Sequence, residues 1–222
     1  MTPLVLSWSG GKDGMLALEA LQAGSEYEVV ALLTTLSREH ERISMHGVRE
    51  TLLDAQAAAL ELPLRKIWLP ANPDNDTYGA AMARELAALR NEGVKHVAFG
   101  DLYLADIRAY REKQLTSEGM HAVFPLWQQP TGDIARRFIA RGYRAILTCV
   151  DTEAINAAFA GREYNARLLA ELPQDCDPAG ENGEFHTFVH DGPLFRQPVA
   201  VTVGESVLRD HRFQFRDLLP AP

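Results

Sequence analysis

Cysteine is scarce in this chain of 222 residues, and long apolar runs are absent. The two cysteines, Cys149 and Cys176, form no CxxC pair and no zinc-binding spacing. They lie in very different surroundings, so we expect no disulfide framework and a reducing, cytoplasmic compartment. No run approaches the roughly eighteen apolar residues that a membrane-spanning helix needs. We therefore expect no membrane partner.

Basic charge is also in short supply. Lys and Arg number 22 against 30 Asp and Glu, which gives a formal net charge of −8 at pH 7. Nonspecific binding of nucleic acid depends on clustered Lys and Arg that neutralise phosphates, so the composition argues against a nucleic-acid partner. An acidic chain can still hold a local basic pocket for ATP. Hydrophobic residues make up 46% of the chain, which is ample for a core.

Strand-like and helix-like runs alternate over about the first two thirds of the chain. The expected strands are residues 4–8, 28–33, 64–69, 96–100, 120–124 and 144–150. The expected helices are residues 15–23, 48–60, 78–91, 105–118 and 131–141. This alternation predicts an α/β fold, a doubly wound parallel sheet with helices on both faces. In such sheets ligands bind beyond the carboxyl ends of the strands.

The pattern changes after about residue 173. Pro173 and Pro178 interrupt the helical signal, and residues 175–183 are typical of an irregular loop. Three strand-like runs follow at 184–190, 199–207 and 212–218 with no helix between them, so we expect them to pair antiparallel. We expect a nucleotide-binding domain over residues 1–124 and a smaller C-terminal domain over residues 125–222.

Residues 9–14, SGGKDG, join the first strand to the first helix. Two glycines at such a turn let backbone N–H groups face an anion, and the positive end of the helix dipole adds to this. Lys12 supplies a full positive charge, and Asp13 is a carboxylate that can hold Mg²⁺ beside phosphate oxygens. Two blander interpretations stay open: an ordinary glycine-rich turn, and an acid that satisfies the helix dipole.

Two further stretches carry candidate residues. Residues 44–49, SMHGVR, lead into a helix. In this stretch His46 and Arg49 are either ligands or an exposed histidine and a solvated arginine. Asp101 ends a strand at the edge of the predicted crevice, which favours a functional role. Arg108 is a candidate ligand too, although its spacing from Glu112 also suits a surface ion pair.

A polar strand follows the irregular loop. Side chains alternate along a strand, so Glu184, His186 and His190 are expected to share one face. An acid and two histidines on one face favour proton transfer, and which of the three acts as the base stays open. A solvated strand face is the plain alternative, and the HExxH signature of zinc enzymes is absent.

Together these stretches resemble one family, the diphthine–ammonia ligases of the ATP pyrophosphatase superfamily, also called the ATP-binding domain 4 family. Residues 9–14 are similar to its SGGKDS loop, with Gly14 in place of serine. Residues 45–49 resemble its MHGVR stretch, 100–112 its Gly-Asp…Arg…Arg-Glu stretch, and 124–127 its FPLW stretch. The most specific match is to its GExGEFxT and DGPLF blocks, at 180–187 and 191–195, where His186 replaces a glutamate of many members.

The resemblance implies a HUP-type nucleotide α-hydrolase domain and a ligase reaction. ATP, with Mg²⁺, adenylates a substrate carboxylate and releases pyrophosphate, and ammonia then displaces AMP to form an amide. In the family's best-known member the carboxylate belongs to diphthine, a modified histidine of translation elongation factor 2. The acceptor expected here is a carboxylate on a small molecule or on a modified protein side chain, and a homodimer is compatible with the resemblance.

The resemblance also assigns residues to roles. Those expected to bind ATP are Ser7, Ser9, Gly10, Gly11, Lys12, Asp13, Gly14, Thr34, His46, Arg49, Gly100 and Asp101. Those expected to bind the acceptor are Asp101, Arg108, Glu181, Asn182, Glu184, His186 and Thr187. Those expected to be catalytic are Lys12, Asp13, Glu184 and His186, with Asp13 as the magnesium ligand.

Two other functions stay open at this point. A tRNA-modifying adenylating enzyme is disfavoured by the acidic charge and by the absence of a basic extension for RNA. A non-catalytic sensor that binds adenine nucleotides is favoured by Gly14, where the missing serine removes a donor to pyrophosphate. The polar strand face at Glu184 disfavours the sensor, because a sensor has no need of a second polar face.

Overall fold

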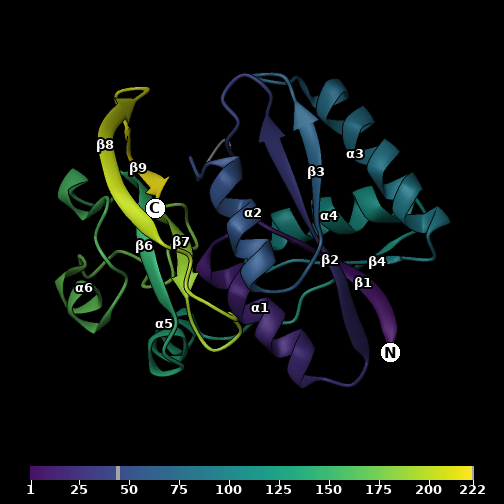
Figure 1. Ribbon diagram of the computed structural model, residues 1–222, viewed down its shortest axis with the longest axis horizontal. Helices are drawn as coiled ribbons and strands as arrows, with labels where there is room; N and C mark the ends of the chain where they lie inside the picture. The colour runs from purple at the N-terminus through teal and green to yellow at the C-terminus, as the bar shows by residue number, and fades with distance from the viewer. Residues whose placement is uncertain (44–45, 222) are drawn as a thin grey trace.

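The computed structural model describes residues 1–43 and 46–221. Its first sheet has five parallel strands in the order β3-β2-β1-β4-β5 (Figure 1). These strands are β1 (Thr2–Ser7), β2 (Tyr27–Ser37), β3 (Leu64–Leu69), β4 (His96–Ala98) and β5 (His121–Val123). The helices that connect them are α1 (Lys12–Ala23), α2 (Glu50–Ala59), α3 (Asn75–Asn91) and α4 (Ala105–Ser117). The predicted doubly wound α/β architecture is confirmed.

A second, antiparallel sheet follows, with four strands in the order β7-β6-β9-β8. Its strands are β6 (Arg144–Asp151), β7 (Phe185–Asp191), β8 (Val201–Arg209) and β9 (Phe213–Pro220). Around it lie α5 (Thr131–Ala140), the short 3₁₀ helix η1 (Ala157–Phe159) and α6 (Ala166–Glu171). Among the described residues, no helix is long and apolar enough to cross a membrane.

Two expectations about this part of the chain were wrong. The strand at 144–150 was expected in the parallel sheet, but β6 pairs antiparallel with β7 and β9. The three last strands were expected to pair antiparallel with one another; β8 and β9 do so as a hairpin, but β7 pairs with β6 instead. Ala145 to Val150 are buried without interruption, and such a run does not reveal which sheet it joins.

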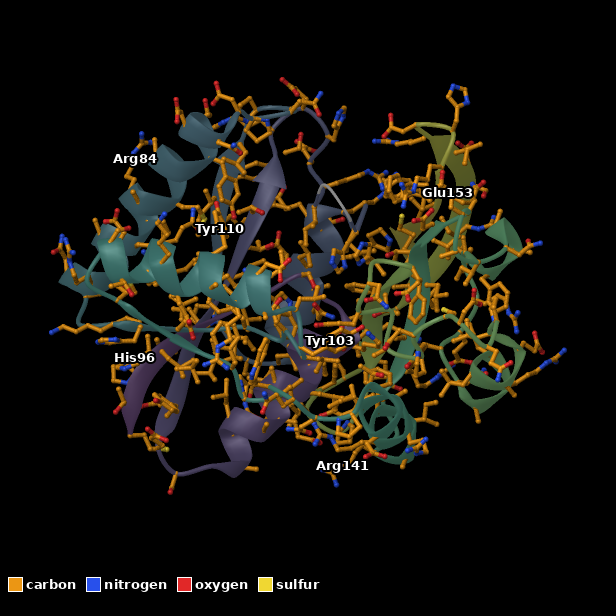
Figure 2. The ribbon with its side chains drawn as sticks, turned by 180° about the vertical axis from the view of Figure 1, so that it is seen from behind. Arg84, His96, Tyr103, Tyr110, Arg141 and Glu153 are labelled. Atoms are coloured by element: carbon orange, nitrogen blue, oxygen red, sulfur yellow. The ribbon has the colours of Figure 1, made fainter. Side chains whose placement is uncertain are left out.

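The helices cover the two faces of the first sheet unequally. Figure 1 shows α1 and α2 between the two sheets. There Leu16 and Leu53 share a core with Phe138 of α5 and Phe188 of β7. On the opposite face α3 and α4 bury a smaller core that includes Leu86. Seen from behind, α3 lies far from the second sheet (Figure 2). Residues at the carboxyl ends of β1, β2 and β4 line one cavity together with residues of the segment 180–187, which precedes and begins β7.

Candidate active site

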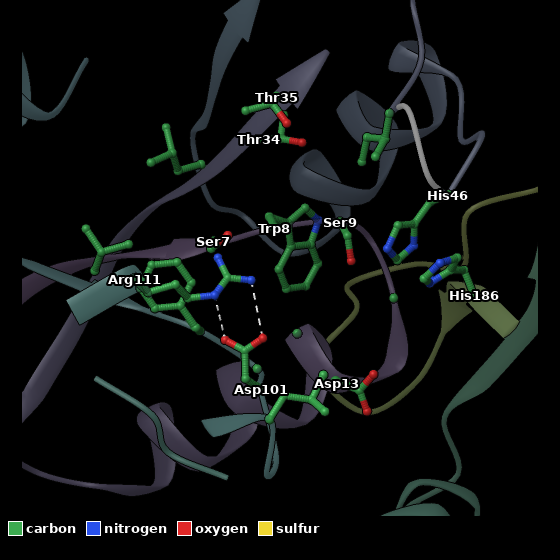
Figure 3. Close-up of a pocket in the computed structure, with 18 of the residues that line it drawn as sticks. Ser7, Trp8, Ser9, Asp13, Thr34, Thr35, His46, Asp101, Arg111 and His186 are labelled. Carbon is green, nitrogen blue, oxygen red and sulfur yellow. Dashed lines mark hydrogen bonds and ion pairs between the residues drawn. The ribbon is translucent and has the colours of Figure 1, made fainter. Parts of the chain in front are cut away.

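A cavity of about 480 Å³, here the first cavity, lies beyond the carboxyl ends of β1, β2 and β4 (Figure 3). It collects most of the residues predicted from the sequence. The predicted residues that line it are Ser7, Ser9, Gly11, Lys12, Asp13, Gly14, Thr34, His46, Gly100, Asp101, Glu181, His186 and Thr187. The predicted residues that do not line it are Gly10, Arg49, Arg108, Asn182, Glu184 and His190. Ser44 and Met45 of the predicted motif lie outside the described residues.

Gly10 does not line the cavity, but its backbone conformation determines the turn between β1 and α1. Its φ of +78° is accessible mainly to glycine, and a Cβ there would lie 3.0 Å from Gln56 Oε1. The Gln56 side chain accepts a hydrogen bond from Trp8 Nε1 (2.8 Å) and donates to the carbonyl oxygens of Gly10 (3.1 Å) and Val189 (2.6 Å). Helix α2 and strand β7 thereby fix the conformation of the loop.

Contacts from β7 and from the segment after β4 hold the start of α1. The backbone N–H of Lys12 donates to Thr187 Oγ1 of β7 (3.1 Å). Gly100, just after β4, packs so closely that a Cβ there would lie 2.9 Å from the carbonyl carbon of Asp13 and 3.0 Å from the nitrogen of Gly14. The N-terminus of α1, with its partial positive charge, is thus fixed at the cavity wall, where it favours an anion.

Lys12 and Asp13 form an ion pair at this helix start. Lys12 Nζ lies 3.0 Å from Oδ1 and 2.8 Å from Oδ2 of Asp13. The lysine residue is only 2% exposed, and its ammonium lies 5.6 Å from the centre of the Phe185 ring. Burial raises the pKa of Asp13, and the adjacent ammonium opposes that shift. An anionic ligand must therefore compete with Asp13 for the charge of Lys12.

Asp101 pairs with an arginine that was not among the predicted site residues. Arg111 of α4 lies with Nε 2.8 Å from Asp101 Oδ2, and its guanidinium stacks 4.2 Å from the centre of the Phe99 ring (Figure 3). The predicted Arg108 instead bonds Glu112 at 2.7 Å and does not line the cavity. The Gly-Asp…Arg…Arg-Glu stretch contains both arginines, so the sequence predicts an arginine near Asp101 but does not indicate which of the two it is.

Two histidines from distant segments meet at the cavity wall. The ring centres of His46 and His186 are 4.3 Å apart with an interplanar angle of 31°. Burial lowers the pKa of His186 to about 4 and holds the pKa of His46 well below its ordinary value, so both rings are neutral at pH 7. Among the described residues, His46 Nδ1 and Thr34 Oγ1 are buried without a hydrogen-bond partner. Buried polar atoms without a partner are uncommon in folded proteins, and these two belong to residues that line the first cavity.

The loop before β7 places its two glutamates differently. Glu184 is buried, and its carboxylate accepts hydrogen bonds from the backbone N–H groups of Asp177 and Asn182, both at 3.0 Å. Glu181 lines the cavity, and its Oε1 accepts from the backbone N–H of Leu102 at 2.8 Å. Burial raises the pKa of Glu181 to about 7. His190 is buried away from the cavity, so of the three groups expected on one face only His186 reaches it.

The far end of the first cavity is apolar. Its lining comes mainly from α3, α4 and the sheet beneath them. These residues are Leu33, Tyr78, Met82, Leu86, Val97, Phe99, Tyr110 and Leu115. Sequence reasoning missed them because apolar residues at helical spacing are typical of any core. The cavity therefore suits a molecule with an anionic part at the α1 terminus and a flat, less polar part between α3 and α4.

Comparison with known families agrees with this geometry. The model of the diphthamide synthase N-terminal domain matches residues 1–122, and that of the diphthamide synthase C-terminal domain matches residues 130–214. The chain belongs to the diphthamide synthase family. No curated protein gives a significant match to it. The family that the motifs resemble is confirmed, and diphthamide synthases are ATP-utilising enzymes of the ATP pyrophosphatase kind.

The first cavity of this diphthamide synthase family member has features that suit a nucleotide rather than a metal alone. The fixed loop, the buried Lys12 and the unpartnered atoms of Thr34 and His46 match a polyphosphate with a polar nucleoside. Among the described residues, no cluster of three or more His, Cys, Asp or Glu side chains could hold a metal. Asp13 is one carboxylate, which suits Mg²⁺ because that ion is bound by few protein ligands and by substrate phosphates.

Proposed function

We propose that this diphthamide synthase family member is an AMP-forming ligase that adenylates a substrate carboxylate and amidates it with ammonia. The observation that carries the proposal is the first cavity, where the fixed N-terminus of α1 and the buried Lys12 face an apolar chamber between α3 and α4. We assign nucleotide binding to a domain of residues 1–124 and acceptor binding to a domain of residues 125–222.

The phosphates of ATP bind at the glycine-rich loop in this proposal. A carboxylate oxygen of the acceptor attacks the α phosphorus, and the bond to the bridging oxygen of the β phosphate breaks. Pyrophosphate leaves with the developing charge, which the ammonium of Lys12 and the N–H groups at the start of α1 stabilise. Asp13 would hold Mg²⁺, which supplies further positive charge to the phosphates when it is bound.

The second half of the reaction needs a base. Ammonia attacks the carbonyl carbon of the acyl adenylate, AMP leaves with the electron pair of the broken bond, and the new nitrogen loses a proton. Glu181 is the group we assign to take protons from ammonium or from the new amide nitrogen, because it lines the cavity and its Oε2 has no hydrogen-bond partner among the described residues. Its pKa of about 7 suits proton transfer near neutrality.

The other candidates for the base fit less well. The carboxylate of Glu184 is already occupied by N–H donors of its own loop, so we assign it the positioning of that loop. His186, with a pKa of about 4, is a weak base at pH 7. We assign the paired rings of His186 and His46 to the wall that separates the acceptor from the phosphate loop.

The test is a product analysis with the full chain. ATP, ammonium and a carboxylate acceptor are incubated with the protein, using diphthine-bearing elongation factor 2 in one arm and small carboxylates in another. We expect AMP, pyrophosphate and amide in equal amounts, and no AMP when the acceptor is omitted. Nucleotide binding without AMP in any arm would identify a sensor, and ADP with phosphate would contradict cleavage at the α phosphate.

A further inference from the structure

A second cavity, of about 460 Å³, lies between the segment that joins β2 to α2 and the β8–β9 hairpin. Ile43 lines both cavities, so the two are neighbours across that segment. Arg49, which the sequence assigned to the nucleotide, lines this second cavity and does not line the first. The proposed reaction uses none of the other residues that line it.

Two arginines share one acid in this second cavity. Arg42 Nη1 lies 2.6 Å from Asp217 Oδ1, and Arg49 Nη2 lies 2.6 Å from Asp217 Oδ2. Their hydrogen bonds hold the pKa of Asp217 at about 2 despite its partial burial, so the carboxylate is ionised at neutral pH. A single carboxylate cannot neutralise two guanidinium groups, and this cluster keeps one positive charge.

One more arginine, Arg209, faces the cavity without an acid, whereas Arg216 alternates with Phe215 and Asp217 along β9 and its side chain lies on the other face. Among the described residues, no carboxylate lies within ion-pair distance of Arg209 or Arg216. The Arg209 guanidinium lies 5.5 Å from the centre of the Phe215 ring, and Arg216 reaches only backbone carbonyl oxygens. With Glu205 and Asp210 counted at the rim, the three arginines that face the cavity equal the carboxylates in number, so the lining is less acidic than the whole chain, which carries −8.

A buried hydroxyl completes the lining. Ser37, at the end of β2, is 5% exposed and lines the second cavity. Its Oγ is buried with no hydrogen-bond partner among the described residues. A buried hydroxyl without a partner costs free energy, and this one lies in the wall of a cavity lined by arginines, where a ligand oxygen would complete its hydrogen bond.

We propose that the second cavity binds an oxyanion, the carboxylate or phosphate group of a small molecule. Guanidinium groups recognise these anions through paired, charge-assisted hydrogen bonds. The hydroxyl of Ser37 donates a further hydrogen bond from the buried wall. Phe213 and Phe215 line the same cavity, so the ligand carries an apolar body beside its anionic group. The site does not depend on the reaction in the first cavity.

The experiment follows backbone amide signals of the full chain by NMR during titration with inorganic phosphate or with succinate. Each titration is run with and without a non-hydrolysable ATP analogue, because phosphate also has access to the first cavity. We expect saturable shifts at residues 37, 47 and 207–217 that persist with the analogue present. Tighter binding of succinate identifies a carboxylate ligand, and tighter binding of phosphate identifies a phosphate ester.

Three variants make the result specific. Arg209→Gln, at an exposed position with no ion pair, is expected to weaken the binding about tenfold or more, the effect of one lost charged hydrogen bond. Ser37→Ala is expected to weaken it several-fold. Arg84→Gln is the matched control, because Arg84 is an exposed arginine on α3, far from the second cavity (Figure 2). Absence of saturable shifts with both probes, or equal effects of Arg209→Gln and Arg84→Gln, would overturn the proposal.

Discussion

Gly100→Ala adds a single methyl group where the segment after β4 packs against the backbone of α1. The new Cβ would lie 2.9 Å from the carbonyl carbon of Asp13, 3.1 Å from its oxygen and 3.0 Å from the nitrogen of Gly14. All three are backbone atoms of a helix start, and no side-chain rotation relieves the contact. The helix terminus or the strand end must therefore move.

The expected cost follows from that geometry. Overpacking by one methyl group typically costs about 1–3 kcal/mol, and rigid backbone neighbours place Gly100→Ala in the upper half of this range. For a chain of this size, each kcal/mol lowers the melting temperature by about 2–4 °C. ATP affinity should fall as well, because the displaced atoms carry the N–H groups that we assign to the phosphates.

Gly14→Ala is the matched control for this prediction. Its Cβ would lie 3.4 Å from the Trp8 ring, an ordinary contact, and Gly14 already lies inside α1. Urea unfolding and calorimetric titration with ATP are measured for both variants. We expect Gly14→Ala to match or slightly exceed the wild type in stability, because alanine favours a helix more than glycine. A Gly100→Ala variant with unchanged stability and ATP affinity would refute the close-packing argument.

Four further predictions concern the two cavities. Lys12→Ala should lower the rate of AMP formation by about 10²–10³, measured at saturating ATP, and an unchanged rate would remove Lys12 from the leaving-group site. Glu181→Gln should lower the rate of amide formation by about 10² or more. The rate of the wild-type protein should rise with pH through about 7 as the Glu181 carboxylate ionises, and a flat pH–rate profile would exclude Glu181 as the base. Glu184→Gln should lower the free energy of unfolding in urea by about 1–3 kcal/mol, because the amide NH₂ would face backbone N–H donors. A variant with full stability and lost amide formation would instead make Glu184 catalytic. Asp217→Asn should lower the unfolding free energy by about 2 kcal/mol at pH 6. The Asp217 carboxylate, whose pKa is lowered in the folded protein, stabilises the fold only while it is ionised, so the difference from wild type should close as the pH falls from about 4 towards 2. A difference independent of pH would refute this origin.

Much of the fold could be predicted from local pattern, and the failures have physical reasons. The alternation of strands and helices gives the parallel sheet because each βαβ unit is a local structure. The position of β6 could not be predicted, because a strand buried on both faces looks the same in a parallel sheet and at the centre of an antiparallel one. Its placement depends on pairing with β7 and β9, which lie much later in the chain.

In the candidate active site too, residues in a contiguous motif could be predicted from sequence, and residues fixed by distant partners could not. The glycine-rich loop is a contiguous signal, and the structure places Lys12 and Asp13 at the first cavity. Arg49 could not be placed from sequence, because its partner Asp217 lies 168 residues away. Likewise, strand alternation put Glu184 on the face of His186, but the N–H donors that occupy its carboxylate come from a loop with no regular pattern.

The contacts that fix the glycine-rich loop have a consequence for how the protein is made. In one hydrogen bond the backbone N–H of Lys12 donates to Thr187, which lies 175 residues later in the chain. In a second, the backbone N–H of Val189 donates to the carbonyl oxygen of Gly10. During synthesis from the N-terminus, the loop residues leave the ribosome long before the strand that orders them. The first sheet can form on the nascent chain, but an ordered phosphate site cannot precede the synthesis of β7. If the first cavity binds the nucleotide as we propose, binding requires that nearly the whole chain has been made and has folded.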